Sequence, residues 1–535
     1  MIKEFKKYSC MEKILIICFF LIFVCQLIWI AYINLFQLQY HIGYDASAYY
    51  LKSVEMMRQK TLFISNWAEQ TNMYIDSNVP LAAVLYAITG NIFISWGISN
   101  LFVLFAILVC FYGILKYFCK RMLSVLVSLN LLIGAYNMCS IYIENELGYS
   151  NMMYISFACY AVKMLMILLV IENVLDLEHK KINWFLQIST LILLFFSGLS
   201  SGTYILITAI LPSFIYLALR MFVKNNWKCF LNKTFAFLFL DSIVLLAGKF
   251  FAVNVLGFVA RDSQLTWTGI DNFWKGLGLF ILGYPQSLGA INANTTIGIL
   301  TVNGITLAFG WGICFITVFG IFYYFYKIAT DKGKDENGLL LVSLYVVNTC
   351  IFIFAYMLYT DYAFEVRYMI PLMMFYFIGA GKWIDGLNYN LIVSYFVVIA
   401  LGVCIIGCDL KSDKDLTEVK TNYDELCELA EHIDGISDTK VVYFMGDMID
   451  ARNMRVVDFS RIYKTVAEDG GLHHWGDYLY YDDPSEYPGE VIIVSCNQAL
   501  ENFPYYYEAS RFIETVGKYN IYIMDKNIVN SIPQQ

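Results

Sequence analysis

Long apolar segments constrain this chain more than any other feature of its sequence. Runs of roughly membrane-spanning length occur at 14–36, 96–118, 122–143, 152–175, 184–201, 203–222, 234–257, 297–326, 339–360, 369–384 and 391–408. A bilayer core is crossed by a helix of about 20 apolar residues. Charged residues make up only 15% of the chain, too few to cover a soluble protein of this size. The sequence therefore predicts a predominantly α-helical polytopic membrane protein with about eleven transmembrane helices.

The distribution of basic residues predicts how these helices are oriented. Over residues 1–409, one side of the alternating helices receives 17 Lys and Arg residues and the other side receives six. Cytoplasmic loops carry the excess of positive charge. The first apolar run is too long for the core of a signal peptide and has no small-residue cleavage site after it. We therefore expect a retained first helix, a cytoplasmic N-terminus and, with an odd number of helices, a C-terminus outside.

The composition changes at about residue 410. Residues 410–535 carry 11 Lys and Arg against 23 Asp and Glu. An amphipathic helix is expected over 422–433, where Leu426, Leu429 and Ile433 recur at helical spacing. Strand-like segments follow at 440–445, 455–459, 490–495 and 520–524. We expect two domains, a transmembrane domain over 1–409 and a small extracytoplasmic α/β domain over 410–535, whose acidic charge argues against a nucleic-acid partner.

Cysteine and histidine give little sign of a disulfide framework or a metal centre. Most of the 14 cysteines lie in apolar runs, where they act as small hydrophobic residues. Cys427 and Cys496 lie in the tail, and the sequence does not decide whether a disulfide joins them. His41 stands four residues before Asp45, but two ligands make an incomplete site. No metal-binding residues are assigned, and a requirement for a divalent metal also stays open.

The outer loop over residues 37–95 is too long for a simple connection. Its residues 46–60 predict an amphipathic helix lying flat in the membrane interface, with Tyr50 on the apolar face and Lys52 away from it. Residues 80–94 predict a short apolar helix at the interface or dipping into the membrane.

This loop resembles that of the GT-C class of glycosyltransferases, in particular the protein O-mannosyltransferases and the bacterial aminoarabinose transferase. Gly43-Tyr44-Asp45, Asn78-Val79-Pro80-Leu81 and Arg367-Tyr368-Met369-Ile370-Pro371 are similar to segments of that class. With the helix count and the outer α/β domain, the resemblance spans nearly the whole chain. One departure is that Ala46 follows Asp45, where many members have adjacent Asp and Glu.

The resemblance implies an enzyme that moves a sugar from a polyprenyl-phosphate donor to a cell-envelope glycan, lipid or protein on the outer face. Transfer to a hydroxyl needs a base to take its proton, and Asp45 is the residue that the resemblance assigns to this role. The alternative for Asp45 is a structural one, in which its side chain caps the N-terminus of the helix over 46–60.

Further acidic candidates lie in the outer loops. Glu144 and Glu146 lie in the second outer loop, which supplies an acidic group in some GT-C enzymes. The alternative for both residues, and the simpler one, is a solvated turn. Asp76 and Glu69, later in the first loop, are rivals for the same role.

Basic residues near the outer face are candidates for binding the donor's phosphate. Lys249, Arg261 and Arg367 are predicted to do so, because the departing phosphate needs positive charge beside it. Arg261 as a solvated loop charge and Lys249 snorkelling from its helix are the simpler explanations. Lys163 and Asp241 lie deeper, where ionisable residues are often functional, and either pair with each other or line a cavity.

Three other functions are compatible with this architecture. An envelope polysaccharide polymerase or ligase usually has its large loop late in the chain, whereas here it comes early. A transporter usually shows repeated halves, and no repeat is apparent. A non-catalytic membrane scaffold that has kept the fold is favoured by the missing Asp-Glu pair.

Overall fold

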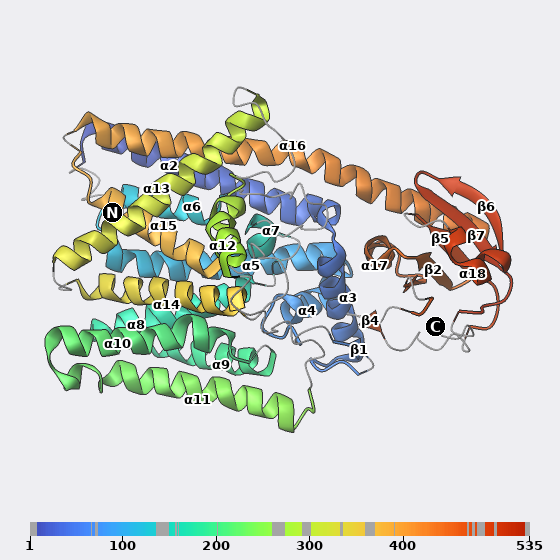
Figure 1. Ribbon diagram of the computed structural model, residues 1–535, viewed down its shortest axis with the longest axis horizontal. Coiled ribbons are helices and arrows are strands. Elements are labelled where there is room, and N and C mark those ends of the chain that lie inside the picture. Colours follow the sequence, from blue (N-terminus) through green and yellow to red (C-terminus); the bar gives the residue numbers. More distant parts are fainter. Residues whose placement is uncertain are drawn as a thin grey trace. The chain divides into compact units, whose positions relative to one another are not determined.

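The computed structural model describes residues 8–65, 67–69, 73–134, 149–155, 158, 160–200, 202–258, 273–290, 301–331, 335–358, 370–389, 391–467, 470–472, 477–478, 487–496 and 500–529. Its contacts divide the chain into two compact units (Figure 1). The membrane unit comprises Met1–Ile33, Met73–Asn78 and Asn100–Asp415. The loop–tail unit comprises Asn34–Asn72, Val79–Ser99 and Leu416–Gln535.

A helix occupies part of every predicted apolar run. The α-helices are α2 (Cys10–Tyr32), α5 (Ile92–Phe118), α6 (Met122–Leu132), α7 (Tyr149–Tyr154), α8 (Ala161–Glu178), α9 (Trp184–Ser200), α10 (Leu211–Lys224), α11 (Lys233–Asn254), α12 (Phe273–Ser287), α13 (Val302–Thr330), α14 (Glu336–Leu358), α15 (Ile370–Asp385) and α16 (Ile392–Ile436). Short π or 3₁₀ segments are η1 (Ile33–Gln37), η2 (Leu38–His41), η3 (Leu206–Ile210) and η4 (Trp227–Cys229).

Seven helices in the described ranges are long and apolar enough to cross a bilayer. They cover Cys10–His41, Ile92–Phe118, Leu206–Lys224, Lys233–Asn254, Leu307–Thr330, Glu336–Phe354 and Ile392–Leu410. Other apolar helices, such as Met122–Leu132 and Trp184–Ser200, are shorter. The prediction of a multi-pass membrane protein is therefore confirmed, whereas the count of eleven transmembrane helices is not.

Ion pairs join the helix ends that were predicted to be cytoplasmic. Arg220 on α10 binds Glu178 at the end of α8 and approaches Glu336 at the start of α14 to 2.8 Å. Arg121, before α6, pairs with Glu12 in the first turn of α2 at 3.2 Å. These contacts agree with the predicted alternation of helix direction, while the side of the membrane on which they lie stays a prediction.

Helices α9 and α11 pack side by side through two glycines (Figure 1). A Cβ atom on Gly198 would lie 2.0 Å from the carbonyl oxygen of Leu245, and one on Gly248 would lie 2.3 Å from that of Phe195. Small residues allow such close backbone approach between membrane helices. The glycine at 198 therefore serves helix packing.

The tight turn predicted over 197–202 lies at the end of that segment. Residues Ser197–Ser200 still belong to α9, and Gly202 has a φ of +79°. Its N–H donates to the carbonyl oxygen of Ser197 at 3.1 Å. This is the left-handed conformation that glycine adopts readily after a helix.

The loop–tail unit contains a mixed β-sheet. Its elements are α3 (Tyr44–Gln59), β1 (Trp67–Ala68), α4 (Val79–Thr89), β2 (Val441–Met445), α17 (Met448–Val457), β3 (Ile462–Val466), β4 (Asp477–Tyr478), β5 (Val491–Ser495), η9 (Leu500–Asn502), α18 (Pro504–Glu508), β6 (Ser510–Val516) and β7 (Tyr519–Met524). The strand order is β3-β2-β5-β7-β6, in which β2 is parallel to β3 and β5, and β7 is antiparallel to β5 and β6.

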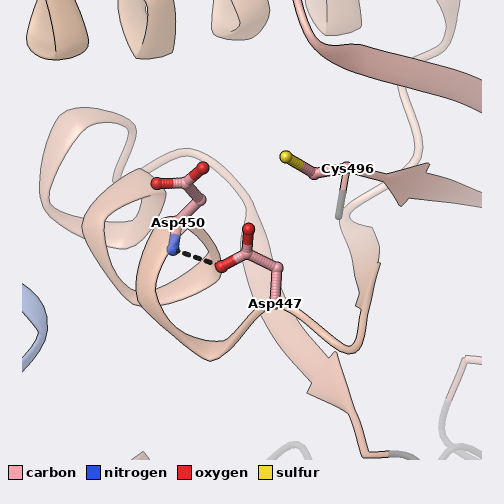
Figure 2. A group of neighbouring side chains, drawn as sticks. All are labelled: Asp447, Asp450 and Cys496. Carbon is pink, nitrogen blue, oxygen red and sulfur yellow. Dashed lines mark hydrogen bonds between the residues drawn. The ribbon is translucent and has the colours of Figure 1, made fainter. Parts of the chain in front are cut away.

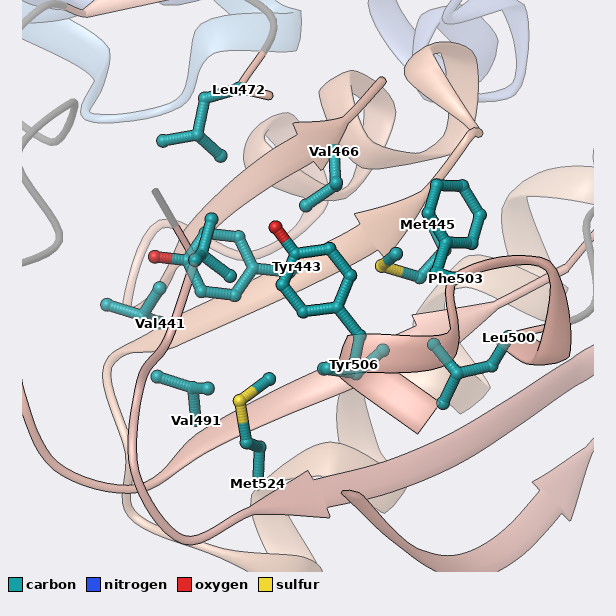
Figure 3. Packing of buried hydrophobic residues seen from close by; sticks show 12 residues of the cluster. Val441, Tyr443, Met445, Val466, Leu472, Val491, Leu500, Phe503, Tyr506 and Met524 are labelled. Carbon is teal, nitrogen blue, oxygen red and sulfur yellow. The ribbon is translucent and has the colours of Figure 1, made fainter. Parts of the chain in front are cut away.

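The central strands β2 and β5 are buried along their whole length. Continuous apolar runs are typical of strands covered on both faces. On one face, Val441, Tyr443 and Met445 pack with Val491 and Met524 in the core shown in Figure 3. The small α/β domain predicted for the tail is therefore present.

The structure confirms three of the four predicted strands and overturns the fourth. Strands β2, β5 and β7 lie where segments 440–445, 490–495 and 520–524 were expected. Segment 455–459 is not a strand, because α17 continues to Val457. The side chain of Asp447 caps this helix by accepting the N–H groups of Ile449 and Asp450, a start signal that the strand prediction overlooked.

Candidate functional site

The proposed base lies in the first turn of α3. The helix runs from Tyr44 to Gln59, and Gly43 holds the N-cap position. Asp45 is thus inside the helix, so the alternative in which Asp45 is the capping residue is wrong. Its side chain lies outside the described part of the structure.

Helix α3 forms where predicted, but it is not a surface helix. Its apolar Tyr50 and Val54 are buried, and so are its polar residues Lys52 and Glu55. The Lys52 ammonium binds the carboxylate of Glu69 at 2.7 and 2.5 Å. Burial lowers the pKa of Lys52, and Glu69 opposes that shift. Glu69, one of the rival acidic candidates, is therefore engaged in neutralising a buried lysine.

The C-terminal tail packs against α3. Helices α3 and α17 pack together, and Ser47 donates a hydrogen bond of 2.7 Å to the side-chain oxygen of Asn453. Strand β1 pairs with β4 of the tail in antiparallel register. The ring of Tyr423 on α16 stacks edge-on against Tyr40 and Phe93. Most of the long first loop and the tail are consequently parts of one unit, whereas Met73–Asn78 of the loop belongs to the membrane unit.

A buried ion pair lies in the membrane unit. The ammonium of Lys163 on α8 is 3.9 Å from the carboxylate of Asp76, and their side chains are 7% and 0% exposed. The rings of Tyr74, Tyr160 and Tyr204 lie 6.0, 5.4 and 6.0 Å from that ammonium. Buried charges are costly, and buried ionisable residues with a charged partner are frequent at functional sites. Asp76, a rival acidic candidate in the sequence, is thus brought next to a cation.

The alternative in which Lys163 and Asp241 pair with each other is wrong. Asp241 on α11 instead accepts a hydrogen bond of 3.0 Å from the side-chain amide of Gln187 on α9. Lys163 pairs with Asp76, because the first loop returns a carboxylate to the start of α8. Both buried acids therefore have a polar partner on another segment of the chain.

Lys249 is the one proposed phosphate contact whose side chain is described. It is exposed, and its ammonium lies over the turn after α9, where a Cβ atom on Gly202 would come within 3.3 Å of Nζ. Ser197, at the start of the same turn, donates to the carboxylate of Asp76 at 3.4 Å. The turn therefore contacts both Asp76 and Lys249.

The remaining predicted site residues are outside the described ranges. These residues are Glu144, Glu146, Arg261 and Arg367. His41 is buried, and its Nε2 atom has no hydrogen-bond partner in the described part of the chain. The described thiols, Cys427 and Cys496 included, are free, so no disulfide joins those two in this structure.

A cluster that the sequence did not suggest lies where β2 and β5 end (Figure 2). Carboxylate oxygens of Asp447 and Asp450 and the sulfur of Cys496 lie within 4.8 Å of one another. Ligands often bind at the carboxyl ends of parallel strands. Here, however, Lys518 approaches the Asp450 carboxylate to 2.9 Å, and the Tyr519 hydroxyl donates to it at 2.7 Å. A metal ion bound by these two carboxylates and the thiol would have to displace the ammonium.

Burial perturbs the titration of this cluster. The pKa of Asp447 is raised, first by burial and then by the neighbouring Asp450. Burial raises the pKa of the Cys496 thiol to about 12, although Lys518 opposes the shift. These are the shifts of groups whose charged forms are poorly solvated. The single ammonium of Lys518 therefore neutralises only part of the cluster.

Comparison with known proteins supports the fold. No family model matches the sequence, and no curated protein matches it significantly. Two crystal structures of ArnT from Cupriavidus metallidurans do match. The structure bound to undecaprenyl phosphate has a TM-score of 0.57 at 12% identity, covering 94% of this chain and 97% of that chain. The apo structure gives 0.57 and 12%, covering 96% and 99%. The predicted fold, a polytopic helical protein with a small C-terminal α/β region, is therefore confirmed as similar to that of ArnT over nearly the whole chain.

Proposed function

We propose that this chain is a GT-C membrane glycosyltransferase that moves a sugar from a polyprenyl phosphate to a cell-envelope acceptor. The observation that carries the proposal is the whole-chain match to ArnT, one structure of which is bound to undecaprenyl phosphate. The sequence adds Gly43-Tyr44-Asp45 at the start of the first outer loop, as in that class.

In the proposed reaction Asp45 takes the proton of the acceptor's hydroxyl group. The freed oxygen attacks the anomeric carbon of the sugar as the bond from that carbon to the phosphate oxygen breaks. A single displacement inverts the anomeric centre. Lys249, Arg261 and Arg367 are the proposed contacts of the departing polyprenyl phosphate, because cations stabilise the charge that develops there.

Asp76 is our first choice for a second acidic group, ahead of Glu144 and Glu146. Asp76 is buried in the membrane unit beside Lys163. It also accepts a hydrogen bond from Ser197, in the turn that Lys249 contacts. Buried ionisable residues with a charged partner are frequent at functional sites. Glu69 is a weaker choice, because its carboxylate is bound to Lys52.

The proposed active site faces the outside of the membrane. The excess of 17 basic residues over six supports a cytoplasmic N-terminus and an extracytoplasmic C-terminal domain. The polyprenyl carrier would lie in the outer leaflet, and the acceptor would be a glycan, lipid or protein of the envelope. A requirement for a divalent metal is open and is tested by adding a chelator to the assay below.

The test is transfer of radiolabelled sugar from polyprenyl-phosphate donors in membranes that express the wild type, Asp45→Asn or Asp434→Asn. The last is a matched control, because Asp434 is an exposed acid on α16 that pairs with Arg461. We expect turnover by the wild type and the control, and its loss in Asp45→Asn at equal expression. Removing a general base lowers rates by about 100- to 10,000-fold.

Each other outcome would move the proposal. Equal turnover by all three proteins would keep the transferase and remove Asp45 as its base, leaving Asp76, Glu144 and Glu146. No turnover by any of them with any donor would refute the enzymatic proposal. It would favour a non-catalytic scaffold, an alternative that the missing Asp-Glu pair supports.

A further inference from the structure

The first turn of α3 is bound to the tail by one buried hydrogen bond. Ser47 and Asn453 are 0% and 1% exposed, and the serine hydroxyl donates to the asparagine oxygen at 2.7 Å. A serine inside a helix usually donates to the carbonyl four residues back, as Ser53 does to Tyr49 at 2.9 Å. Ser47 instead reaches across to another helix. This bond therefore fixes α3 relative to α17, two residues after Asp45.

Asn453 makes no other side-chain hydrogen bond in the described part of the chain. The nitrogen of its amide is buried without a partner there. Burying an amide is unfavourable unless it is hydrogen-bonded. A buried asparagine whose amide nitrogen lacks a partner therefore lowers the stability of the fold compared with an apolar residue of similar size. The contact with Ser47 is the one side-chain hydrogen bond of Asn453 among the described residues.

The N-terminal part of α17 is itself bound to the rest of the tail. Asp447 caps the helix, and Asp450, one turn before Asn453, is bound by Lys518 and Tyr519 at the start of β7. The side chains from Asp450 to Val456 are all buried. The helix is thereby anchored to the sheet of the tail. A rigid support of this kind is what an accurately positioned functional group requires.

We infer that Asn453 is a positioning residue, through which the tail holds the first turn of α3 and with it the proposed base Asp45. The inference rests on the proposed function, since Asp45 acts only if the chain is a transferase. It makes the tail a structural support of the loop that carries Asp45. Displacement of a catalytic group by about 1 Å can lower a rate by about a hundredfold.

The kinetic test uses Ser47→Ala, Asn453→Ala and the double variant in the sugar-transfer assay. We expect kcat to fall about ten- to a hundredfold in each single variant, with the donor KM unchanged. The double variant should be no slower than the singles, because both substitutions remove the same bond. Ser47→Thr, which keeps the hydroxyl, should retain most of the activity. Additive losses, or a change confined to KM, would overturn the inference.

A control separates positioning from general loss of stability. Asn527→Ala removes another buried asparagine of the tail, which donates to the hydroxyl of Tyr443 at 3.0 Å. It should lower thermal stability about as much as Asn453→Ala while leaving kcat near that of the wild type. If Asn527→Ala slows turnover equally, the effect of Asn453 is structural and the inference fails.

Amide hydrogen exchange tests the contact between Ser47 and Asn453 without any turnover. In Asn453→Ala, residues 46–51 should exchange faster than in the wild type, while the amides of β2 and β5 stay protected. Unchanged protection of residues 46–51 would overturn the inference that Asn453 holds the first turn of α3. If exchange changes as expected but the wild type transfers no sugar, the contact is real and the proposed function has failed.

Discussion

Replacing Lys163 by methionine tests the buried ion pair of the membrane unit. At 3.9 Å, opposite unit charges attract by about 4 kcal/mol if the effective dielectric constant is about 20. Removing one member of a buried pair typically destabilises a protein by about 3–5 kcal/mol, because the other charge stays buried. Lys163→Met should therefore lower the unfolding temperature strongly, as followed by thermal unfolding in detergent.

A double variant then separates stability from function. Lys163→Met with Asp76→Asn removes both charges and keeps similar shapes, and the asparagine can still accept from Ser197. Uncharged replacements of a buried pair are often neutral or even stabilising. We expect most of the lost stability to return. Sugar transfer, measured below the unfolding temperature of every variant, should stay lost if the pair acts on the substrate.

An exposed pair provides the control. Lys224 and Glu336 form an ion pair at side-chain exposures of 39% and 33%. Lys224→Met should cost at most about 1 kcal/mol, the usual range for exposed pairs. If Lys163→Met is as mild as Lys224→Met, the argument from burial is refuted. If the double variant regains both stability and turnover, the pair is structural and Asp76 is not the second acidic group.

Three further predictions follow from local geometry. Gly248→Ala should destabilise the protein by about 1–3 kcal/mol, since the new Cβ meets the carbonyl of Phe195, whereas Gly278→Ala, with nothing within 4 Å, should not; equal thermal stability of both would contradict the packing of α9 on α11. Asp447→Asn should keep the helix cap and stabilise the protein at pH 8 more than at pH 4. The raised pKa means that the folded state holds the proton more tightly, so stability is lost as pH rises above the unfolded value of 3.8 through the raised one; a variant whose melting temperature shows the same pH dependence as the wild type would count against this. Cys496 should react with iodoacetamide at pH 8 on the order of a thousandfold more slowly than a free thiol, because burial raises its pKa from 9.0 to about 12; rapid labelling detected by mass spectrometry would exclude that shift.

The sequence predicted the helices of the membrane unit well, because a bilayer demands long apolar runs whatever the rest of the chain does. It predicted less about the first outer loop. The amphipathic pattern of α3 indicated an exposed polar face, yet Lys52 and Glu55 are buried. Lys52 pairs with Glu69, and α17, a helix distant in the sequence, packs on α3. Local periodicity carries no information about such contacts.

The tail shows the same limit at smaller scale. Leu426, Leu429 and Ile433 are fully buried, as their helical spacing predicted. Segment 455–459 has a strand-like composition, but the cap at Asp447 starts a helix that runs into it. Tertiary context and capping outweigh strand propensity here.

The candidate site was predicted only in part. Sequence pattern singled out Asp45 and listed Asp76 among several acids, but it could not pair Asp76 with Lys163, since those residues meet only through the fold. The cluster of Asp447, Asp450 and Cys496 was also missed. Asp447 and Cys496 follow the ends of two parallel strands, and Asp450 lies in the first turn of α17. A strand order cannot be inferred from residue spacing alone.

The bond between Ser47 and Asn453 spans 406 residues of sequence. At about 5–20 residues per second, a ribosome needs roughly 20–80 s to make that stretch. During this interval α3 has been synthesised, whereas α17, which packs on it and binds Ser47, has not. Maturation of the first loop is therefore a late event in biogenesis. A transcript truncated before α17 would yield a chain with its membrane helices complete and this loop unfinished, a substrate for cellular quality control.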